Sequence, residues 1–464
     1  MGLTTASGNA FSEAVRGGLA KSLRRKLVWG VTSLVLKVDD FLRREINRRQ
    51  FLGRSACQAA SVAAGVVSLA TSAPAGPNER LHVAVLGVRN RGRELAGLLA
   101  ARPDVEVRVL CDVDAGVFPA AVAAVVEQGR PAPQCERDVR RVLEHPQIDA
   151  VFIATPDHSH VPLAKLACQA GKDVYLESPA TWCVGEGPEL VNVVRQTRRI
   201  VQCGVQERSS QALQAALAVV RGGQLGKVHL VRAWTVHRRK PIPPKPDTPP
   251  PVDLDYAAWL GSAPPRPFNA NRYHFNWRWY WDYGGGELAF WGSHWLDLAR
   301  LGLELSWPRR IAAAGSVLPA STSTETPDAL TVQFDCGAAT VLWEHRLSSN
   351  HGVEGRSAGV AFYGERGVLI LDRGGWKVYD GEPLHGTASV KEMEAAHLEN
   401  FLECVRSRAI PVAPVADAVI SAGWCHLGNL SYRLRRELRF DAERLTCPDT
   451  PEAAALLSRS SQDV

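Results

Sequence analysis

The sequence predicts an α/β fold with a parallel sheet for its first folded domain, residues 79–205. Apolar strand-like runs alternate there with amphipathic helix-like segments, which is typical of a parallel sheet covered by helices. The first run, Leu81–Gly87, ends in a glycine-containing turn, and the next one, Val105–Leu110, is followed by Cys111 and Asp112. Strand, turn, helix and second strand together make a βαβ unit of ordinary size.

The turn after the first strand has the spacing of a dinucleotide-binding loop. Gly87 permits a tight turn, and Gly92 permits close packing of the following helix on the strand. Asn90 and Arg91 stand at the start of that helix, whose N–H groups can bind a pyrophosphate. Arg89 replaces the middle glycine of the usual G-x-G-x-x-G pattern. The context favours a dinucleotide site, and the alternative is a doubly wound domain with an empty crevice.

Asp112 predicts which dinucleotide is bound. It lies about 20 residues past Gly92, where a carboxylate accepts hydrogen bonds from the adenosine ribose hydroxyls. A carboxylate there also repels a 2′-phosphate, so the sequence favours NAD over NADP. Ligands bind outside the carboxyl ends of parallel strands, and two later strands should end at the same crevice. Their ends supply the remaining cofactor candidates, which are Thr155, Pro156, His160, Glu177 and Pro179.

Composition excludes several classes of protein. Residues 1–75 hold eleven Lys/Arg and four Asp/Glu, so the formal net charge of +6 belongs to this segment and gives no basis for nucleic-acid binding. The ten cysteines form no C-x-x-C pair and have no histidine at metal-ligand spacing. We therefore expect free cysteines, mostly in the core, and no metal site. No apolar run reaches the ~20 residues that a membrane-spanning helix needs.

Residues 1–75 are predicted to be an export leader. The segment Asn47–Gly53 resembles a twin-arginine motif, and an apolar stretch and a small-residue site, Ala73–Gly76, follow it. The alternative is a basic amphipathic helix. An export leader implies a periplasmic or cell-envelope location, and it makes the twin-arginine export machinery a partner.

From residue 79 to about 445 the order of motifs resembles the glucose–fructose oxidoreductase / inositol dehydrogenase / MocA (Gfo/Idh/MocA) family. Besides the glycine turn, the motifs are Cys111–Asp114, Ala154–His160, Glu177–Pro179, Asn276–Leu288, Gly292–Asp297 and His397–Ser407. The resemblance implies a C-terminal α+β domain over 206–445, built on an open, mostly antiparallel sheet. It implies that a helix near 397–408 packs back on the first domain, and it leaves 446–464 as a tail.

The same resemblance implies a reaction. Members transfer a hydride at a hydroxyl of a sugar, cyclitol or related polyol with NAD(P), and we also expect a homo-oligomer. Two positions depart from the family pattern, because the family lysine is Ser178 here and the family aspartate is Phe290. Only His294 remains as a group that exchanges a proton near neutral pH. His294 is therefore the catalytic candidate, together with Ser178 as the position of the family lysine.

These departures leave three functions open: an oxidoreductase, a dinucleotide- and carbohydrate-binding protein that has lost turnover, and a structural subunit. His294 itself could be either the acid–base group or a core histidine. The sequence cannot name the substrate.

Aromatic residues are dense in this part of the chain. Among those within nineteen residues are Trp277, Trp279, Tyr280, Trp281, Trp291 and Trp295. Flat rings can stack on the C–H faces of sugars, and Asn276 and Arg278 could bond sugar hydroxyls. The predicted substrate residues are therefore Asn276, Arg278 and Trp291. Aromatic residues at this density also form cores and subunit interfaces, and we expect that role for most of them.

The leader assignment can be tested by replacing Arg48 and Arg49 together with lysine. The twin-arginine route requires this pair, so the double variant should stay in the cytoplasm while the unmodified protein reaches the cell envelope. Cell fractionation followed by immunoblotting measures the distribution. Arrival of the double variant in the envelope would refute the leader.

Overall fold

The computed structural model describes residues 80–318 and 323–458. All of these residues belong to one compact unit. The proposed leader, residues 1–75, lies outside the described residues, so it stays a prediction.

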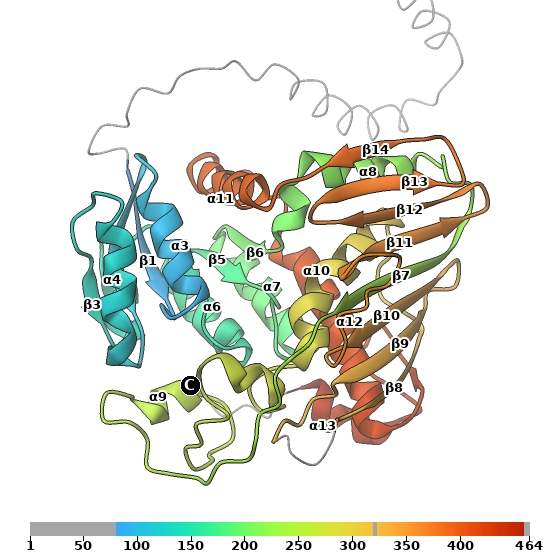
Figure 1. Cartoon of the computed structure of the whole chain (residues 1–464). Coiled ribbons are helices and arrows are strands. Elements are labelled where there is room, and N and C mark those ends of the chain that lie inside the picture. Colours follow the sequence, from blue (N-terminus) through green and yellow to red (C-terminus); the bar gives the residue numbers. More distant parts are fainter. Residues whose placement is uncertain (1–79, 319–322, 459–464) are drawn as a thin grey trace, which may run out of the picture. The chain divides into compact units, whose positions relative to one another are not determined.

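Six parallel strands form the sheet of the first domain, in the order β3-β2-β1-β4-β5-β6 (Figure 1). Their bounds are β1 (Leu81–Leu86), β2 (Val105–Cys111), β3 (Gln134–Glu136), β4 (Ala150–Ile153), β5 (Asp173–Glu177) and β6 (Val201–Gly204). The central strands β1, β4 and β5 are largely buried apolar runs. The strand order reverses between β1 and β4, which is where sheets of this kind bind ligands.

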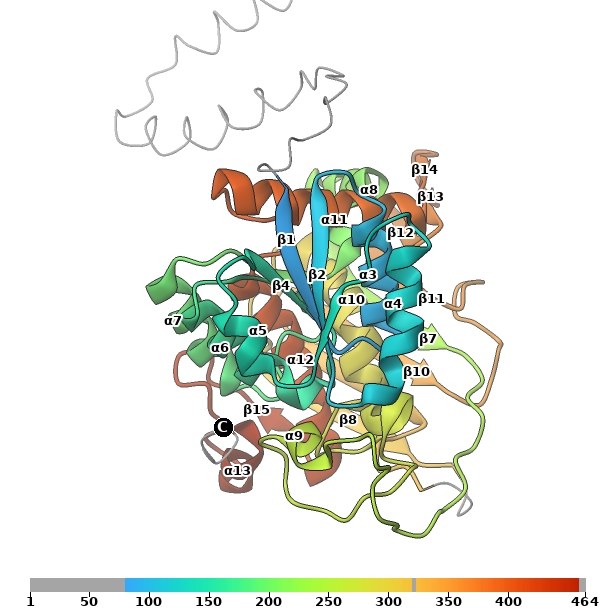
Figure 2. The same ribbon diagram turned by 90° about the vertical axis from the view of Figure 1, so that its left-hand side faces the viewer.

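Alternate residues of β1 belong to two different cores, because side chains of a strand point to opposite faces. Val83 and Val85 pack with α3 (Arg91–Ala100) and α4 (Phe118–Val126). Ala84 and Leu86 share a core with helices on the other face, which are α5 (Val139–Glu144), α6 (His160–Gln169) and α7 (Glu186–Thr197). Figure 2 shows the two groups of helices on either side of β1 and β2. The predicted parallel sheet covered by helices is confirmed.

Helix α11 (Val390–Ser407) comes from late in the chain but packs on the first domain. Phe401 is fully buried there, and its ring meets the rings of Phe152 and Tyr175 edge-on at centroid distances of 5.3 and 5.7 Å. Leu398 and Leu402 belong to the same core. These contacts fix α11 to β4 and β5 of the first sheet.

The second sheet has nine strands in the order β14-β13-β12-β11-β7-β10-β9-β8-β15. Neighbours pair antiparallel except β7 and β10, which are parallel. The bounds are β7 (Val228–Val236), β8 (Arg310–Ser316), β9 (Ala329–Asp335), β10 (Thr340–Arg346), β11 (Ala358–Gly364), β12 (Gly367–Asp372), β13 (Gly375–Tyr379), β14 (His385–Thr387) and β15 (Leu438–Arg439). The expectation of an open, mostly antiparallel sheet is confirmed.

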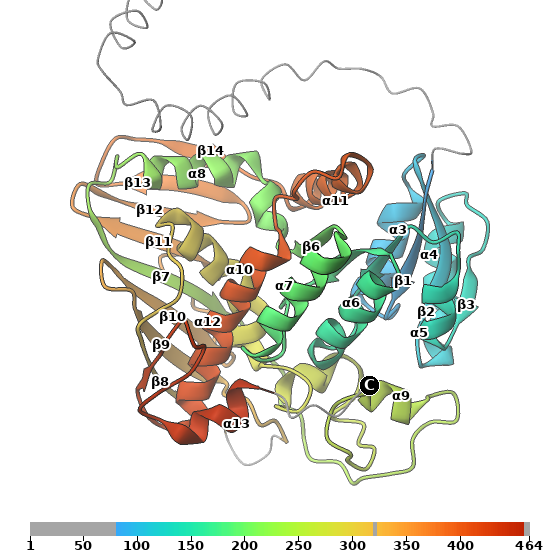
Figure 3. The ribbon, with the colours of Figure 1, turned by 180° about the vertical axis from the view of Figure 1, so that it is seen from behind.

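Three helices cover one face of this sheet and separate it from the first domain (Figures 1 and 3). They are α8 (Gln211–Arg221), α10 (Gly286–Gly302) and α12 (Val415–Leu434). Helix α10 is almost entirely buried, because α12 packs on one side of it and the sheet on another. A helix enclosed in this way can present polar side chains in fixed positions.

A buried ion pair connects α10 to the turn η4 (Gln206–Ser209) that follows β6. The Arg208 guanidinium donates to both carboxylate oxygens of Asp297 on α10, at 2.5 and 2.8 Å. Its Nη1 also lies 2.6 Å from Oδ2 of Asp417 on α12. Burial would raise the pKa of the Asp297 carboxyl, but Arg208 holds it below the usual range. The pair therefore stays charged and joins three elements.

The segment predicted to be a tail is packed as far as the structure describes it, so that prediction was wrong up to residue 458. Ala453 and Leu457 are buried in the core of the second sheet, and Leu457 belongs to the short helix α13 (Ala454–Leu457). The N–H of Gly185 donates to the Leu457 carbonyl at 2.7 Å. Cys447 is buried in the same core, so several apolar residues fix the segment.

Nine cysteines lie in the described ranges, and seven of them are buried, as expected for cysteines of the core. Over the two described ranges, no helix is long and apolar enough to cross a membrane.

Replacement of Phe401 by alanine should destabilise the protein by about 3–5 kcal/mol, because it leaves a cavity between α11 and the first sheet. Urea unfolding of the two proteins measures the change in the free energy of unfolding. Glu403→Ala is the matched control, since Glu403 is exposed on the same helix and should change stability by less than about 0.5 kcal/mol. Equal effects of the two substitutions would contradict the packing described here.

Candidate active site

A cavity of about 820 Å³ lies at the carboxyl ends of β1, β2, β4 and β5, and we call it the crevice cavity. Nine predicted cofactor residues line it, namely Gly87, Arg89, Asn90, Arg91, Asp112, Thr155, Pro156, His160 and Glu177. Gly92 and Pro179 lie behind them and are not part of the lining. The second domain closes the opposite side with α9 (Tyr256–Leu260) and the turn η5 (His274–Trp279).

The glycines of the first turn allow backbone segments to approach very closely. Gly87 has φ +80°, and a Cβ on it would lie 2.9 Å from the Ala154 backbone. A Cβ on Gly92 would lie 1.9 Å from the Gly87 carbonyl oxygen. Only glycine fits either position, and α3 therefore starts directly at the crevice. The side chain of its N-cap residue, Asn90, does not cap it, so the first N–H groups face a place where an anion would bind.

Asp112 is held in place by two backbone donors. Its Oδ2 accepts from the Val88 N–H at 2.8 Å, and its Oδ1 accepts from the Asp114 N–H at 3.0 Å. Burial raises the pKa of the Asp112 carboxyl to about 6, although both donors favour the ionised form. At neutral pH the group is mostly a carboxylate, and its remaining lone pairs can accept from a ribose.

Arg91 and Glu177 line the crevice cavity but hold each other. The Arg91 Nε lies 2.7 Å from Oε1 of Glu177, and its Nη2 lies 2.8 Å from Oε2 of Glu394 on α11. Together they join the ends of β5, α3 and α11. Their ion pair shapes the wall of the crevice cavity, and direct contact of either residue with a cofactor stays a prediction.

His160 connects two of the strand ends. It is buried, and its ring nitrogens lie 2.8 Å from the Pro179 carbonyl and 2.9 Å from the Thr155 carbonyl. Burial lowers the pKa of the imidazole, although the contacts with the two carbonyl oxygens favour the protonated ring. His160 and Pro179 therefore support the cavity wall through backbone contacts.

The two catalytic candidates are in direct contact. Ser178 follows β5 and its Oγ lies 2.9 Å from Nε2 of His294 on α10. The other ring nitrogen of His294, Nδ1, lies 2.9 Å from Oε2 of Glu207 in η4. The side chains of His294 and Glu207 are 8% and 1% exposed, whereas Ser178 lines the crevice cavity. The sequence named both Ser178 and His294 as candidates but missed Glu207, and the catalytic role of the two stays a prediction.

Glu207 is ionised in this setting. Its Oε1 lies 2.6 Å from Nη2 of Arg373, a residue at the β12–β13 turn that the sequence also missed. Burial alone would raise the pKa of the Glu207 carboxyl, but His294 and Arg373 together hold it well below its usual range. One signal could have found Glu207: like the other residues of the site, it comes just after a parallel strand, β6.

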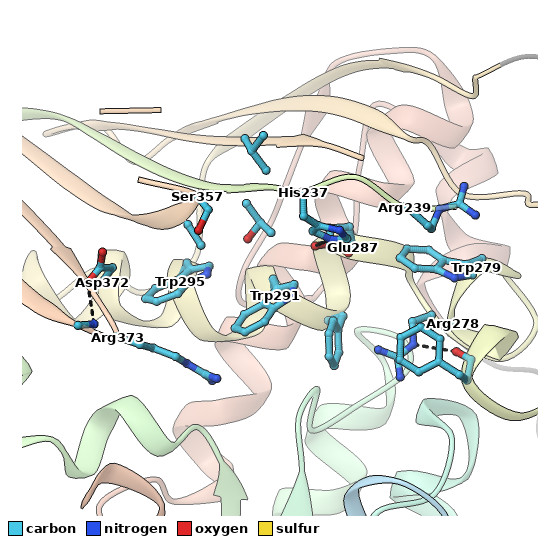
Figure 4. A pocket seen from close by; sticks show the side chains of 16 residues that line it. His237, Arg239, Arg278, Trp279, Glu287, Trp291, Trp295, Ser357, Asp372 and Arg373 are labelled. Carbon is cyan, nitrogen blue, oxygen red and sulfur yellow. Dashed lines mark hydrogen bonds and ion pairs between the residues drawn. The ribbon is translucent and has the colours of Figure 1, made fainter. Parts of the chain in front are cut away.

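A second cavity of about 700 Å³ lies between α10 and the second sheet (Figure 4), and we call it the sheet cavity. Phe275, Arg278 and Phe290 line both cavities, so the two meet there. Figure 4 shows Trp291 and Trp295 on α10 beside Arg373, whose guanidinium lies 4.7 Å from the centroid of the Trp291 ring.

Arg278 lies between aromatic rings at the junction of the cavities. Its guanidinium is 3.9 Å from the Phe275 ring and 4.2 Å from the Phe290 ring, and its Nε donates to the Phe275 carbonyl. Burial lowers its pKa to about 10, although Asp157 and Glu287 oppose this, so it stays charged at neutral pH. Among the described residues, its buried Nη1 has no hydrogen-bond partner and could donate to a ligand.

The three predicted substrate residues differ in their position relative to the two cavities. Arg278 and Trp291 line the sheet cavity, whereas Asn276 lines neither cavity, so the structure gives its predicted contact with a substrate no support. The turn η5 directs Arg278 inwards and leaves Asn276 aside, which sequence proximity does not reveal. Of the aromatic residues nearby, Trp279, Tyr280 and Trp295 are buried, as expected for structural aromatics. The described ranges contain no group of His, Cys, Asp and Glu residues that could hold a metal ion.

Two family models match the chain. The model described as oxidoreductase family, NAD-binding Rossmann fold, matches residues 81–205, and the one described as oxidoreductase family, C-terminal alpha/beta domain, matches residues 231–350. Together they match more than half of the sequence. The chain belongs to the Gfo/Idh/MocA oxidoreductase family. Its first domain is an NAD-binding Rossmann domain, and the glycine turn, the start of α3 and Asp112 fit that cofactor.

Curated relatives in this family match over part of their length. A glycosyl hydrolase family 109 protein of Saccharopolyspora erythraea is 33% identical over 159 residues, which are 32% of this chain and 34% of the relative. One of the same name from Stenotrophomonas maltophilia is 34% identical over 193 residues, 40% of this chain and 41% of the relative. The chain thus spans less than half the length of these relatives.

Solved structures of the same fold cover most of the chain. GenD2 from gentamicin A biosynthesis, in complex with NAD, has a TM-score of 0.61 at 19% identity and covers 82% of this chain and all of its own. The aldose–aldose oxidoreductase from Caulobacter crescentus, complexed with glycerol, has a TM-score of 0.60 at 19% identity, covering 78% and 100%. At these identities the likeness shows the shared fold.

Asp112 should set the choice between the two dinucleotides. The unmodified protein should bind NAD(H) more tightly than NADP(H), and Asp112→Ala should reduce the difference between the two affinities. Loss of one charge-assisted hydrogen bond costs roughly 1.5–3 kcal/mol, which is about ten- to a hundredfold in affinity for NAD. Isothermal titration of both proteins with both dinucleotides measures this. Tighter NADP(H) binding by the unmodified protein would remove Asp112 from this role.

The affinity for NAD should also depend on pH. Ribose hydroxyls donate to the carboxylate form of Asp112, whose pKa is about 6, so affinity should fall by about tenfold between pH 7 and pH 5 as the group takes up a proton. Asp157, also in the crevice cavity, has a pKa raised to about 8 by burial and stays largely protonated over this range. Asp112→Asn should bind more weakly but with little change from pH 7 to 5. An unchanged dissociation constant for the unmodified protein would contradict the assignment.

Proposed function

We propose that this protein is an NAD-dependent oxidoreductase that acts on a hydroxyl group of a sugar, a cyclitol or a related polyol. One observation carries the proposal: the crevice cavity meets the sheet cavity at Phe275, Arg278 and Phe290, and the Ser178–His294 pair stands at the wall of the crevice. A substrate in the sheet cavity would lie beside the cofactor and beside a group that can take a proton.

Each part of the site has a chemical task. When bound, NAD supplies the acceptor for a hydride. Asp112 and the start of α3 would orient the dinucleotide, and Arg278 and Trp291 would bind a hydroxylated ring through a hydrogen bond and a stacked face. His294 provides the base for the hydroxyl proton, which hydroxyl oxidation requires.

The comparisons support a carbohydrate-like substrate. Proteins of the same fold include the aldose–aldose oxidoreductase and a levoglucosan dehydrogenase in complex with NADH, which has a TM-score of 0.60 at 16% identity. The names of the curated relatives add glycosides to the candidate substrates.

Two further proposals rest on the sequence. The protein is exported by the twin-arginine machinery to the periplasm or cell envelope, and it assembles as a homo-oligomer.

A second candidate function is a dinucleotide- and carbohydrate-binding protein without turnover. The observation in its favour is Phe290, whose ring packs against Arg278 where relatives carry an aspartate. Neither Phe290 nor the uncharged Ser178 can stabilise a developing alkoxide as an ammonium would.

The two functions differ in turnover. Purified protein with NAD should produce NADH, followed by absorbance, with at least one member of a panel of sugars, glycosides, cyclitols and polyols. His294→Ala should lower the rate by about 10²–10⁴-fold, the usual contribution of general acid–base catalysis, and should leave NAD affinity unchanged. The exposed His351 offers a matched control, since His351→Ala should keep the full rate.

Two results would overturn parts of this proposal. An unchanged rate in His294→Ala would place the catalytic group elsewhere. Absence of turnover with every compound, with NAD still bound, would favour the binding protein.

A further inference from the structure

We infer that Ser178, His294 and Glu207 form a proton relay in which the Ser178 hydroxyl, and not the His294 ring, meets the substrate hydroxyl. The inference rests on the proposed function, because it names the atom that takes the substrate's proton. It also gives Ser178 a function of its own at the position where relatives carry a lysine.

Access to the cavities distinguishes Ser178 from His294. Ser178 lines the crevice cavity, whereas His294 lines neither cavity and has a side chain only 8% exposed. A ligand in either cavity therefore cannot contact the imidazole directly. A ligand in the crevice cavity can reach Ser178, whose Oγ lies 2.9 Å from His294 Nε2.

Glu207 determines where the protons of this chain reside. An ionised carboxylate only accepts hydrogen bonds, so the 2.9 Å contact between Glu207 Oε2 and His294 Nδ1 requires the proton to be on Nδ1. In a neutral ring Nε2 then carries no proton and accepts the hydrogen bond of the Ser178 hydroxyl. The lone pairs of Ser178 Oγ remain available to accept from a substrate hydroxyl. Arg373 on the other oxygen of Glu207 keeps the carboxylate charged.

The proton balance of the relay is complete. The substrate hydroxyl gives its proton to Ser178 Oγ as the Ser178 proton moves to His294 Nε2. Ser178 is unchanged at the end, and His294 is an imidazolium beside the Glu207 carboxylate. The carbinol C–H bond breaks, its electron pair leaves with the hydrogen as the hydride that NAD accepts, and the carbon becomes a carbonyl.

A serine, a histidine and a carboxylate in this order also occur in serine hydrolases, where the serine is a nucleophile. Acyl transfer needs N–H donors for the oxyanion, and the residue after the nucleophile usually supplies one of them. The residue after Ser178 is Pro179, which has no N–H. The geometry therefore favours proton transfer over nucleophilic attack by Ser178.

The relay predicts one tautomer of His294 in the protein without ligand. Long-range nitrogen–proton NMR of ¹⁵N-histidine-labelled full-length protein should show a protonated Nδ1 and an unprotonated Nε2, with the signal assigned by its loss in His294→Gln. In Glu207→Gln the amide can donate to Nδ1, and the proton should move to Nε2. A protonated Nε2 in the unmodified protein overturns the relay, and this spectrum suffices even if Glu207→Gln does not fold.

Activity tests the end of the relay at Ser178. With a compound from the panel that turns over, Ser178→Ala should lower kcat at least 100-fold at an unchanged affinity for NAD. Ser178→Thr, which keeps a hydroxyl, should recover at least a tenth of the rate. Ser407→Ala removes an exposed hydroxyl at the end of α11 and is the matched control. Full activity of Ser178→Ala overturns the relay.

A fluorophosphonate probe tests the nucleophile alternative. The relay predicts no labelling of Ser178, and covalent labelling of that serine would overturn it. The NMR experiment needs neither NAD nor substrate, so failure of the proposed function can be distinguished from failure of the relay. The expected tautomer without turnover of any compound would overturn the proposed function alone.

Discussion

The buried ion pair between Arg208 and Asp297 is the contact on which the geometry of the site depends. Arg208 directly follows Glu207, and Asp297 lies one helical turn after His294 on α10. Since both charges are almost fully buried, neither can leave the other without a large desolvation cost. The pair thereby holds η4 against α10, and this sets the distance between the Glu207 carboxylate and the His294 ring.

The two sheets contribute different parts of one site. Parallel strands end together, so the first sheet supplies a wall made of short turns, with the glycine loop, Asp112 and Ser178 after β1, β2 and β5. The second domain supplies a buried helix, α10, and a broad sheet face with aromatic and charged side chains. Helix α11 returns to the first domain, and Arg91 ties it to Glu177 at the end of β5. These ion pairs at the wall of the crevice cavity therefore connect the first half of the site to α11.

The two departures from the family pattern, Ser178 and Phe290, are consistent with this arrangement of the site. A lysine at position 178 would supply charge and proton transfer in one side chain. Here a serine provides the hydroxyl, while the charge that controls the proton lies on Glu207, further from the cavity. The Phe290 ring covers Arg278 at the junction of the two cavities, which places an aromatic face where a carboxylate would compete for that guanidinium.

Local sequence patterns determined the βαβ unit, the glycine turn and the place of Asp112, because each depends on residues within about thirty positions of one another. They also identified Ser178 and His294 as candidates. Only the tertiary structure decided that Ser178 lies in the cavity and His294 behind it, that Asn276 lies outside, and that Glu207 completes the chain. Ser178 and His294 are 116 residues apart, and Glu207 is 87 residues from His294. No spacing rule relates such positions, because their distance is set by how two sheets and a buried helix pack together.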